Sequence, residues 1–579
     1  MFEFVLVRSP KKRDDRPRRR GTLNEADAAE SLKRARALLS RGAESDAIAI
    51  LTRAVALNPS HSAVATRLGY CLHLSGQLAA AAAEYRRALT LDPTRFDAWY
   101  ALGCVELNRK RDAQAIRCFR RALALRPGSA RAHFDLGRAL FGTGDIDAAL
   151  DSFRIAATDR LELRNEALAR VARIIPGSPR ADNAAVLEAR REWATVEAVA
   201  EGILMSTRRR ARSTGRKLRV GYVSAFFRSS NWMKPVWGVI NHHDRARFDI
   251  HLLSDGDPPN EEGGYSRHPR DRLHDVRSMS NRELAAAVIR LRIDILVDLN
   301  GYSFQKRFGL FMRRPARVII GWFNMYATTG IGAFDYIVGD DAVIPENEER
   351  FYSERVVRVP GSYLAFSVLY PVPDVAPPPC LATGNLTFGS FGSQYKLTDE
   401  VIGAWATILG RAPGSRLLLK NRALADASNQ AALRRRFRCH NIPAERVLLD
   451  GPDEHWQFLA AYARIDIALD TFPYNGGTTT TEALWQGVPV LTFNGDRWVS
   501  RTSRSLLLAA GLGEWCAPDL SAYIERAIAL AGATTTPAEI AVLRWSMRSR
   551  LSAAPVCDTA ALCRALENLY RDAAVREDV

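Results

Sequence analysis

Two stretches of 25 residues decide the fold of the N-terminal part of the chain. Residues 69–93 read GYCLHLSGQLAAAAAEYRRALTLDP, and residues 103–127 read GCVELNRKRDAQAIRCFRRALALRP. A glycine, an aromatic residue, an alanine and a proline recur in the same order, each 34 residues after its counterpart. The columns continue at Leu51, Ala54, Pro59, Gly137, Phe153 and Ala156. A fixed period shared by four independent columns predicts an array of stacked helical units.

Each column has a physical role in such an array. The glycine lets the two helices of one unit approach closely, and the aromatic side chain is expected to fill the gap to the next unit. Proline is tolerated in the first turn of a helix because its missing N–H would have no partner there. These features resemble the tetratricopeptide repeat, of which about three and a half units fit residues 27–160. Because such arrays bind extended polypeptide on their concave face, we expect this one to recruit polypeptide partners.

The overall composition narrows the class of protein. Of the 579 residues, 47% are apolar and 25% are charged, which excludes collagen-like, fully disordered and disulfide-scaffold proteins. No apolar run approaches the roughly 20 residues that span a bilayer, and the first residues do not form a signal-peptide pattern. We therefore expect a cytoplasmic protein without a membrane span, whose eight cysteines are reduced thiols.

The formal charge of +17 is concentrated in two short stretches. Residues 8–20 hold eight Arg or Lys side chains against two acids, so residues 1–26 are interpreted as a basic, disordered tail. A weak contact of this tail with RNA or anionic lipid is the alternative interpretation. Residues 161–217 read as a helical linker that ends in a second basic loop. No aromatic residue accompanies this loop to stack bases, so we expect no specific nucleic-acid site.

From Leu218 onward, short β-rich runs alternate with helical stretches, as in parallel α/β domains. Five prolines mark residues 371–384 as a linker. The sequence thus predicts two Rossmann-like domains facing a cleft, over residues 218–370 and 385–579. The expected strands are 218–224, 248–254, 293–299, 318–322, 336–339, 386–391, 416–420, 447–449, 465–469 and 489–493. Neither G-x-G-x-x-G after a first strand nor a P-loop motif occurs, which argues against dinucleotide and P-loop enzymes.

The segment after the strand 465–469 carries the most specific chemistry. It reads DTFPYNGGTTTTEALW over residues 470–485. Two glycines followed by threonines at a helix start leave backbone N–H groups pointing outward, where an anion binds. Glu482, one turn into this helix, can accept hydrogen bonds from a ribose diol. The alternative without a ligand is a helix capped by threonine, with Glu482 in solvent. Lys396, in the segment GSFGSQYKLT over residues 389–398, adds a point charge suited to a diphosphate.

Together these features resemble the protein O-GlcNAc transferase family, which includes the plant SPINDLY proteins. The resemblance covers nearly the whole chain, and its motifs are the repeats and residues 298–302, 314–316, 335–336, 391–396 and 469–489. It implies a tetratricopeptide superhelix followed by a GT-B fold. It further implies inverting transfer of GlcNAc from UDP-GlcNAc to Ser or Thr hydroxyls of acceptor polypeptides that the repeats bind. The nucleotide sugar is then a substrate, and no cofactor is implied.

The resemblance also assigns individual residues to the donor site. Lys396 and the amides and hydroxyls of Thr478 and Thr479 would hold the donor diphosphate. Ser393 and Gly477 belong to the same two segments and are included in the predicted donor site. Lys396 would also be catalytic, because it and the helix start at Thr478 would stabilise the charge that develops on the leaving diphosphate.

Other positions match the family less directly. Glu482 falls where the family usually has a ribose-binding aspartate. His455 matches, after a three-residue shift, a family histidine that stacks in the uridine pocket. The chain departs from the family where Ser229 replaces a histidine once proposed as the general base, and where residues 322–330 read WFNMYATTG. Gly477 likewise replaces a histidine before the threonine pair.

The proton of the attacking hydroxyl needs an acceptor within hydrogen-bond reach. With Ser229 in the place of the histidine, the candidates are Asp298 and a phosphate oxygen of the donor. No cluster of acids at metal-ligand spacing lies in these loops, so we expect no essential metal. Two alternatives remain open: a GDP-fucose-dependent enzyme of the same fold, as SPINDLY-type members are, and an interaction protein that has lost turnover.

Overall fold

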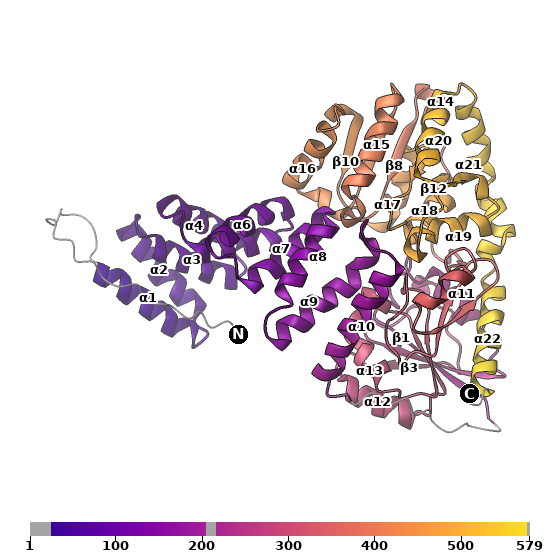
Figure 1. Ribbon diagram of the computed structural model, residues 1–579, viewed down its shortest axis with the longest axis horizontal. Coiled ribbons are helices and arrows are strands. Elements are labelled where there is room, and N and C mark those ends of the chain that lie inside the picture. The colour runs from indigo at the N-terminus through magenta and orange to yellow at the C-terminus, as the bar shows by residue number, and fades with distance from the viewer. Residues whose placement is uncertain (1–24, 204–215, 576–579) are drawn as a thin grey trace. The chain divides into compact units, whose positions relative to one another are not determined.

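The computed structural model of the protein describes residues 25–203 and 216–575 (Figure 1). The predicted basic tail lies almost wholly outside these residues, as does most of the predicted basic loop before residue 217. The described chain forms two compact units. Unit 1 contains the described residues up to Arg109 together with Arg117–Pro127, and unit 2 contains Lys110–Ile116 and the chain from Gly128 onward.

Unit 1 is built from paired helices. They are α1 (Glu25–Leu39), α2 (Glu44–Leu57), α3 (Ser62–Leu74), α4 (Leu78–Leu91), α5 (Phe96–Asn108) and part of α6 (Asp112–Leu125). A Cβ atom at Gly69 would lie 2.9 Å from the Tyr85 ring, and one at Gly103 would lie 2.5 Å from the Phe119 ring. The glycine therefore does permit close approach of the two helices. The aromatic ring packs on the glycine of its own unit, and the expectation that it also fills the gap to the next unit stays a prediction.

From Gly128 onward, the described part of unit 2 contains four α-helices before its first strand, and the first two carry Gly137 and Phe153 of the 34-residue period. The four are α7 (Ala130–Thr143), α8 (Ile146–Ala156), α9 (Leu161–Ile174) and α10 (Asn183–Ala200). Phe153 packs on Gly137 as in unit 1, because a Cβ atom at Gly137 would lie 2.9 Å from the ring. The buried guanidinium of Arg190 on α10 donates to the carbonyl oxygens of Ala172, Met325 and Thr328. These bonds tie the helical segment to the first α/β half.

The first half of unit 2 contains a seven-stranded parallel sheet in the order β3-β2-β1-β4-β5-β6-β7. Its strands are β1 (Leu218–Ser224), β2 (Phe248–Ser254), β3 (Arg272–Asp275), β4 (Ile295–Asp298), β5 (Val318–Gly321), β6 (Tyr336–Gly339) and β7 (Arg355–Arg358). Its helices are α11 (Lys234–His242), α12 (Asn281–Arg290) and α13 (Phe308–Met312). Strand order reverses beside β1, so the loops after β1 and β4 lie at the edge where ligands bind in such sheets.

The second half contains a six-stranded parallel sheet in the order β10-β9-β8-β11-β12-β13. Its strands are β8 (Thr387–Ser390), β9 (Arg416–Lys420), β10 (Val447–Asp450), β11 (Ile467–Leu469), β12 (Val490–Phe493) and β13 (Cys516–Ala517). Its helices are α14 (Cys380–Thr383), α15 (Asp399–Arg411), α16 (Ala427–Arg438), α17 (His455–Ala460), α18 (Thr478–Trp485), α19 (Thr502–Ala509), α20 (Leu520–Gly532) and α21 (Thr536–Ala553). The order reverses beside β8, which brings the loops after β8 and β11 together.

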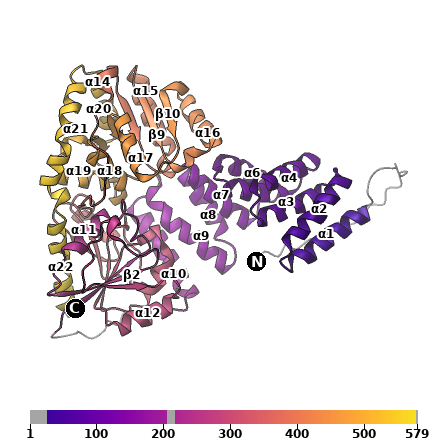
Figure 2. The same ribbon diagram turned by 180° about the vertical axis from the view of Figure 1, so that it is seen from behind.

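The last helix, α22 (Thr559–Val575), returns to the first half and packs against α11 (Figures 1 and 2). Just before it, the chain passes the residues that leave the first half, where the Phe366 amide donates to the Val556 carbonyl oxygen over 2.9 Å. The Ser367 and Thr559 hydroxyl oxygens also lie 3.0 Å apart. The sequence assigned all of residues 385–579 to the second half, whereas the structure places α22 on the first.

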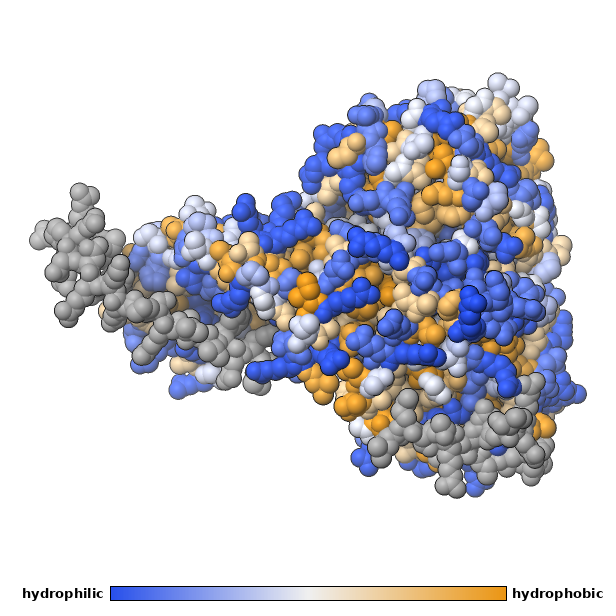
Figure 3. All heavy atoms as spheres, viewed as in Figure 1, coloured by the Kyte–Doolittle hydropathy of each residue, from blue (hydrophilic) through white to orange (hydrophobic). Residues whose placement is uncertain are grey.

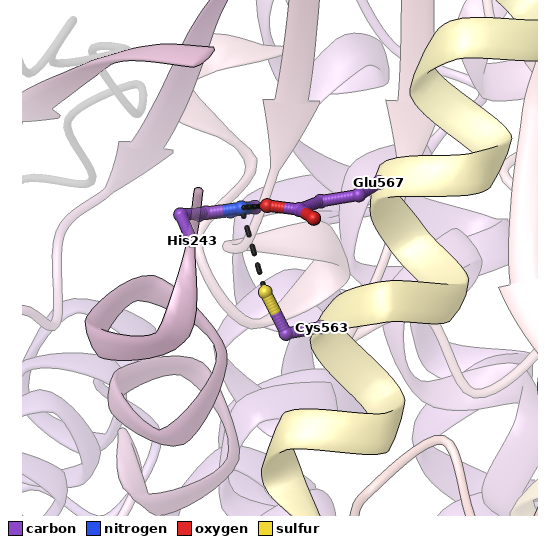
Figure 4. Close-up of side chains that lie close together, drawn as sticks. All are labelled: His243, Cys563 and Glu567. Atoms are coloured by element: carbon purple, nitrogen blue, oxygen red, sulfur yellow. Dashed lines mark hydrogen bonds and ion pairs between the residues drawn. The ribbon is translucent and has the colours of Figure 1, made fainter. Parts of the chain in front are cut away.

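A buried polar network fixes α22 there (Figure 4). His243 Nδ1 hydrogen-bonds Glu567 Oε1 at 2.9 Å and lies 3.5 Å from Cys563 Sγ. The Tyr222 hydroxyl lies 2.7 Å from His243 Nε2 and 2.9 Å from the Tyr570 hydroxyl. Burial lowers the pKa of His243, although the hydrogen bond with Glu567 opposes the shift. The imidazole therefore connects α22 to β1 in its neutral form.

Hydrophilic and hydrophobic side chains are interspersed over the face of unit 2 that Figure 3 shows. None of the described helices combines the length and the apolar character that crossing a membrane requires.

Candidate active site

The loop after β11 is held rigidly by Asp470. The buried carboxylate accepts hydrogen bonds from the Gly476 amide at 2.8 Å and from the Thr492 hydroxyl at 2.9 Å. The Asn475 amide in turn donates to the Val499 carbonyl oxygen at 3.0 Å. A Cβ at Gly476 would collide with the Thr480 hydroxyl, so only glycine fits this position. These contacts fix the direction in which α18 begins.

The start of α18 leaves two threonines available. The Thr481 amide donates to the Gly477 carbonyl oxygen, so the three preceding amides have no partner within the helix. The Thr480 hydroxyl lies 2.9 Å from the Ser503 hydroxyl, and the Thr481 hydroxyl donates to the Thr478 carbonyl oxygen at 2.8 Å. Thr478 and Thr479 are partly exposed. Thr480 and Thr481 thus use their hydroxyls for contacts within the protein. Thr478 and Thr479, which the sequence predicted for the diphosphate, are the partly exposed members of the four.

Lys396 reaches the same loop from the end of β8. Its ammonium donates to the Asn475 carbonyl oxygen at 2.7 Å and lies 4.4 Å from the centroid of the Tyr474 ring. Burial lowers the pKa of Lys396 to about 8, against the attraction of Asp470, which raises it. The structure thus brings a fixed cation to the residues that lead into α18.

Lys396 and Tyr474 border a cleft, whereas Thr478 and Thr479 are not among the residues that line it. Three parts of unit 2 line it, namely the second half, the first half and the helices that precede β1. The side chains that bear on function are Tyr395, Lys396, Tyr474, Tyr302, Asn324, Tyr326, Phe141, Arg173 and Arg190. The cleft is rich in tyrosine, which combines apolar walls with hydroxyl groups that can orient a sugar or a peptide.

Glu482 faces a lysine that sequence reasoning missed. Lys234 Nζ on α11 lies 3.9 Å from Glu482 Oε1, and both side chains are 2% exposed. Burial lowers the pKa of Lys234 and raises that of Glu482, while each charge partly offsets the shift of the other. Glu482 Oε1 has no hydrogen-bond partner among the described residues. The pair joins the two α/β halves, and no local motif marks Lys234 in the sequence.

The other predicted donor residues occupy varied positions. His455 is half-buried at the start of α17, with its ring 5.4 Å from that of Tyr370, and its Nε2 has no hydrogen-bond partner within the described chain. Ser393 is exposed. A Cβ at Gly477 would lie 3.8 Å from the Tyr326 hydroxyl, so Gly477 packs against the first half.

Asp298 is buried at the end of β4. It is 1% exposed, and its carboxylate accepts a hydrogen bond from the Asn300 amide at 2.9 Å. Like Thr478 and Thr479, it is not among the residues that line the cleft. Burial raises the pKa of Asp298 to about 7, against the hydrogen bonds from the loop amides. Its observed contacts are those of a residue that holds the loop after β4. Ser229 sits in the turn before α11, where its carbonyl oxygen accepts from the Met233 amide.

One group of described side chains has ligand atoms close enough for a metal ion, namely His243, Cys563 and Glu567. It lies at the α22 contact, where His243 Nδ1 meets Glu567 Oε1 and Cys563 Sγ while His243 Nε2 meets the Tyr222 hydroxyl. The absence of an essential metal from the reaction stays a prediction.

Comparison with known proteins identifies the family. The model of glycosyl transferase family 41 matches residues 196–367 and 380–566. The chain belongs to glycosyl transferase family 41. A tetratricopeptide repeat model also matches residues 32–96 and 97–161. The predicted order of repeats followed by a two-domain α/β body is thereby confirmed for this family 41 chain.

Relatives with descriptive names support the same placement. A probable UDP-N-acetylglucosamine–peptide N-acetylglucosaminyltransferase SPINDLY of Solanum lycopersicum is 31% identical over 371 residues, which is 62% of this chain and 38% of the relative. The corresponding SEC protein of Arabidopsis thaliana is 27% identical over 365 residues, or 61% of this chain and 37% of the relative. The family 41 chain thus spans less than two fifths of the length of these relatives.

A solved structure covers more of the chain. A mutant O-GlcNAc transferase of Thermobaculum terrenum superimposes with a TM-score of 0.71 at 31% identity, covering 89% of this chain and 98% of that one. The predicted resemblance to the O-GlcNAc transferase and SPINDLY proteins and the predicted GT-B fold are confirmed by these matches.

Proposed function

We propose that this chain transfers GlcNAc from UDP-GlcNAc to Ser or Thr hydroxyls of acceptor polypeptides that the repeats recruit, with inversion and without an essential metal. The observation that carries the proposal is the Lys396 ammonium, held 2.7 Å from the Asn475 carbonyl oxygen in the loop that leads into Thr478. A fixed cation beside a helix start is suited to a leaving diphosphate. The names of the relatives, which describe peptide N-acetylglucosaminyltransferases, support the choice of sugar and acceptor.

The proposed chemistry is a single displacement. The acceptor oxygen forms a bond to the anomeric carbon as the bond from that carbon to the diphosphate oxygen breaks. Lys396 and the amides of Thr478 and Thr479 stabilise the negative charge that the diphosphate gains, and removing one such contact typically reduces the rate about a hundredfold.

The hydroxyl proton passes to a phosphate oxygen of the donor. This choice is favoured because Asp298 is enclosed at the end of β4 and bonded to its own loop. Asp298→Asn should therefore leave transfer within about threefold of wild type in steady-state assays, and so should Ser229→Ala, because a serine hydroxyl is far too weak a base at neutral pH. A loss of turnover in Asp298→Asn with unchanged nucleotide affinity would instead assign the proton to this carboxylate.

A comparison of ligands tests the donor. A nucleotide that binds only the folded protein raises the melting temperature, so UDP and UDP-GlcNAc should stabilise the chain more than GDP and GDP-fucose do. Transfer is then measured on a Ser/Thr peptide by mass spectrometry. Stabilisation by the guanine nucleotides alone would favour a GDP-fucose enzyme. Nucleotide binding with neither transfer nor donor hydrolysis would favour the interaction protein that has lost turnover.

A further inference from the structure

Two departures from the family pattern meet in the structure. One is the loop after β5, where residues 322–330 read WFNMYATTG, and the other is Gly477, which directly precedes α18. A Cβ atom at Gly477 would lie 3.8 Å from the Tyr326 hydroxyl oxygen and 3.7 Å from Thr502 Cγ2, which is ordinary van der Waals contact. An imidazole would extend further than Cβ. A histidine at position 477 would therefore need the space that Tyr326 fills in this chain.

Tyr326 reaches from the first half to the proposed donor site in the second. It lines the cleft together with Lys396 and Tyr474, and the centroids of the Tyr326 and Tyr474 rings lie 5.5 Å apart. Residues 322–325 and 327–330 are buried, whereas Tyr326 is partly exposed. Its side chain thus borders the cleft that Lys396 lines, while its hydroxyl faces the residue that leads into the free amides at the start of α18.

The loop that carries Tyr326 is held in a strained conformation. Phe323 and Tyr326 have φ angles of +85° and +55°, a region that residues other than glycine rarely adopt. The buried Glu354 carboxylate accepts hydrogen bonds from the Thr328 hydroxyl at 2.7 Å and from the Thr329 amide at 2.6 Å. Because strain of this kind persists only where the surroundings fix the backbone, the direction of the Tyr326 ring is set before a ligand binds.

The hydroxyl of Tyr326 is available to a ligand. It donates to Asn324 Oδ1 over 3.5 Å, which is near the upper limit for a hydrogen bond. By contrast, the Tyr302 hydroxyl, which also comes from the first half, donates to the Thr329 carbonyl oxygen at 2.6 Å. Burial raises the pKa of Tyr326, so the hydroxyl keeps its proton at neutral pH and can donate it to an anion.

We propose that the Tyr326 hydroxyl donates a hydrogen bond to the diphosphate of the nucleotide sugar, so that the first half adds a contact to a site otherwise built from the second. A hydrogen bond to a charged oxygen is roughly twice as strong as one between neutral groups. The same contact would stabilise the charge that the diphosphate gains as it leaves. This inference rests on the proposed use of a nucleotide sugar and adds a donor-binding residue to it.

The test compares the binding of UDP and uridine to the full-length protein. Tyr326→Phe keeps the ring and removes the hydroxyl oxygen, so the Kd for UDP should rise about 10- to 150-fold. The Kd for uridine, measured by competition, should change less than about twofold, because uridine has no phosphate to accept the bond. An unchanged Kd for UDP would overturn the proposal, and so would an equal loss of UDP and uridine, which would show that the hydroxyl only maintains the shape of the site.

A matched control removes another buried hydroxyl of the first half. Tyr352 is 8% exposed, does not line the cleft, and its hydroxyl has no hydrogen-bond partner within the part of the chain that the structure describes. Tyr352→Phe should therefore bind UDP as wild type does. UDP-GlcNAc distinguishes the diphosphate from the sugar: if Tyr326→Phe weakens UDP-GlcNAc and leaves UDP unchanged, the hydroxyl contacts the sugar and the proposal is wrong.

A double variant tests whether Tyr326 and a side chain at position 477 compete for one space. Gly477→His should weaken UDP binding, because the imidazole displaces the Tyr326 ring and with it the hydroxyl. Gly477→His/Tyr326→Gly should then bind UDP no more weakly than Gly477→His, since substitutions that share a space are not additive. Losses that add in the double variant would overturn the shared position.

The choice of nucleotide keeps this proposal separate from the proposed function. If wild type binds GDP and not UDP, the proposed donor is wrong, and GDP and guanosine then test Tyr326 in the same way. If wild type binds UDP and transfers GlcNAc, and Tyr326→Phe does both equally well, the proposed function stands and the role of Tyr326 is refuted.

Discussion

The pKa of Lys396 predicts how nucleotide binding depends on pH. With a pKa of about 8 in the empty site, about nine tenths of the Lys396 side chains are charged at pH 7 and about a quarter at pH 8.5. If a diphosphate binds only the charged form, the Kd for UDP should rise about fourfold over this interval. The phosphate groups are already ionised at pH 7, and the upper limit of 8.5 keeps the base from titrating.

Two variants isolate the contribution of this side chain. Arg stays charged throughout the range, so Lys396→Arg should give a Kd that does not change between pH 7 and 8.5. Lys396→Met removes a charge-assisted hydrogen bond worth about 1.5–3 kcal/mol, so the Kd should be about 10- to 150-fold higher at pH 7 and again independent of pH.

The assay is isothermal titration calorimetry of UDP at constant ionic strength, because charge interactions at the cleft are sensitive to salt. A wild-type Kd that is the same at pH 7 and pH 8.5, or a pH dependence that survives in Lys396→Met, would refute the assignment of Lys396 to the diphosphate.

Three further predictions concern the scaffold. Deleting residues 1–127 should impair transfer to protein substrates and spare donor hydrolysis. Deleting residues 1–160 should abolish both activities, because it removes α7 and α8 from the wall of the cleft. Intact donor hydrolysis after the longer deletion would contradict the structure. Gly103→Ala should destabilise unit 1 by about 1 kcal/mol in thermal unfolding. Overpacking costs about 1–3 kcal/mol, and the higher helix propensity of alanine offsets about 1 kcal/mol of this. A higher melting temperature would show that the neighbouring ring moves freely. Burial lowers the pKa of His243 in the folded state, so this side chain takes up a proton at a higher pH in the unfolded chain than in the folded protein. The free energy of unfolding should therefore fall as the pH drops below about 6.5. The fall should be smaller in His243→Gln, and an equal fall in this variant would show that His243 does not cause it.

Much of the fold could be predicted because the signals are local. The 34-residue period and the alternation of apolar runs with helical stretches gave the order of domains and the positions of the central strands. Two sheet-edge strands were missed for the opposite reason: β3 reads RLHD and β7 reads RVVR, and neither is a buried apolar run. The third missed strand, β13, has only two residues and too short a pattern to recognise.

The candidate site divides along the same line. Lys396, Thr478 and Thr479 could be found because glycine, threonine and lysine follow strands of one half at a recognisable spacing. The residues on the other side could not be found, because Lys234, which faces Glu482, and Arg173, which lines the cleft, lie on elements distant in the sequence that show no motif. A sequence pattern identifies what one segment offers to a ligand, and only the tertiary structure shows what stands opposite.

The return of α22 to the first half constrains how the two halves can move relative to each other. The chain passes between the halves twice, and the Phe366–Val556 hydrogen bond fastens the two passages side by side. Two adjacent connections resist a twist of one half against the other and permit bending about a single axis. Lys234 Nζ and Glu482 Oε1 belong to opposite halves and lie 3.9 Å apart, so the distance between them would report such bending.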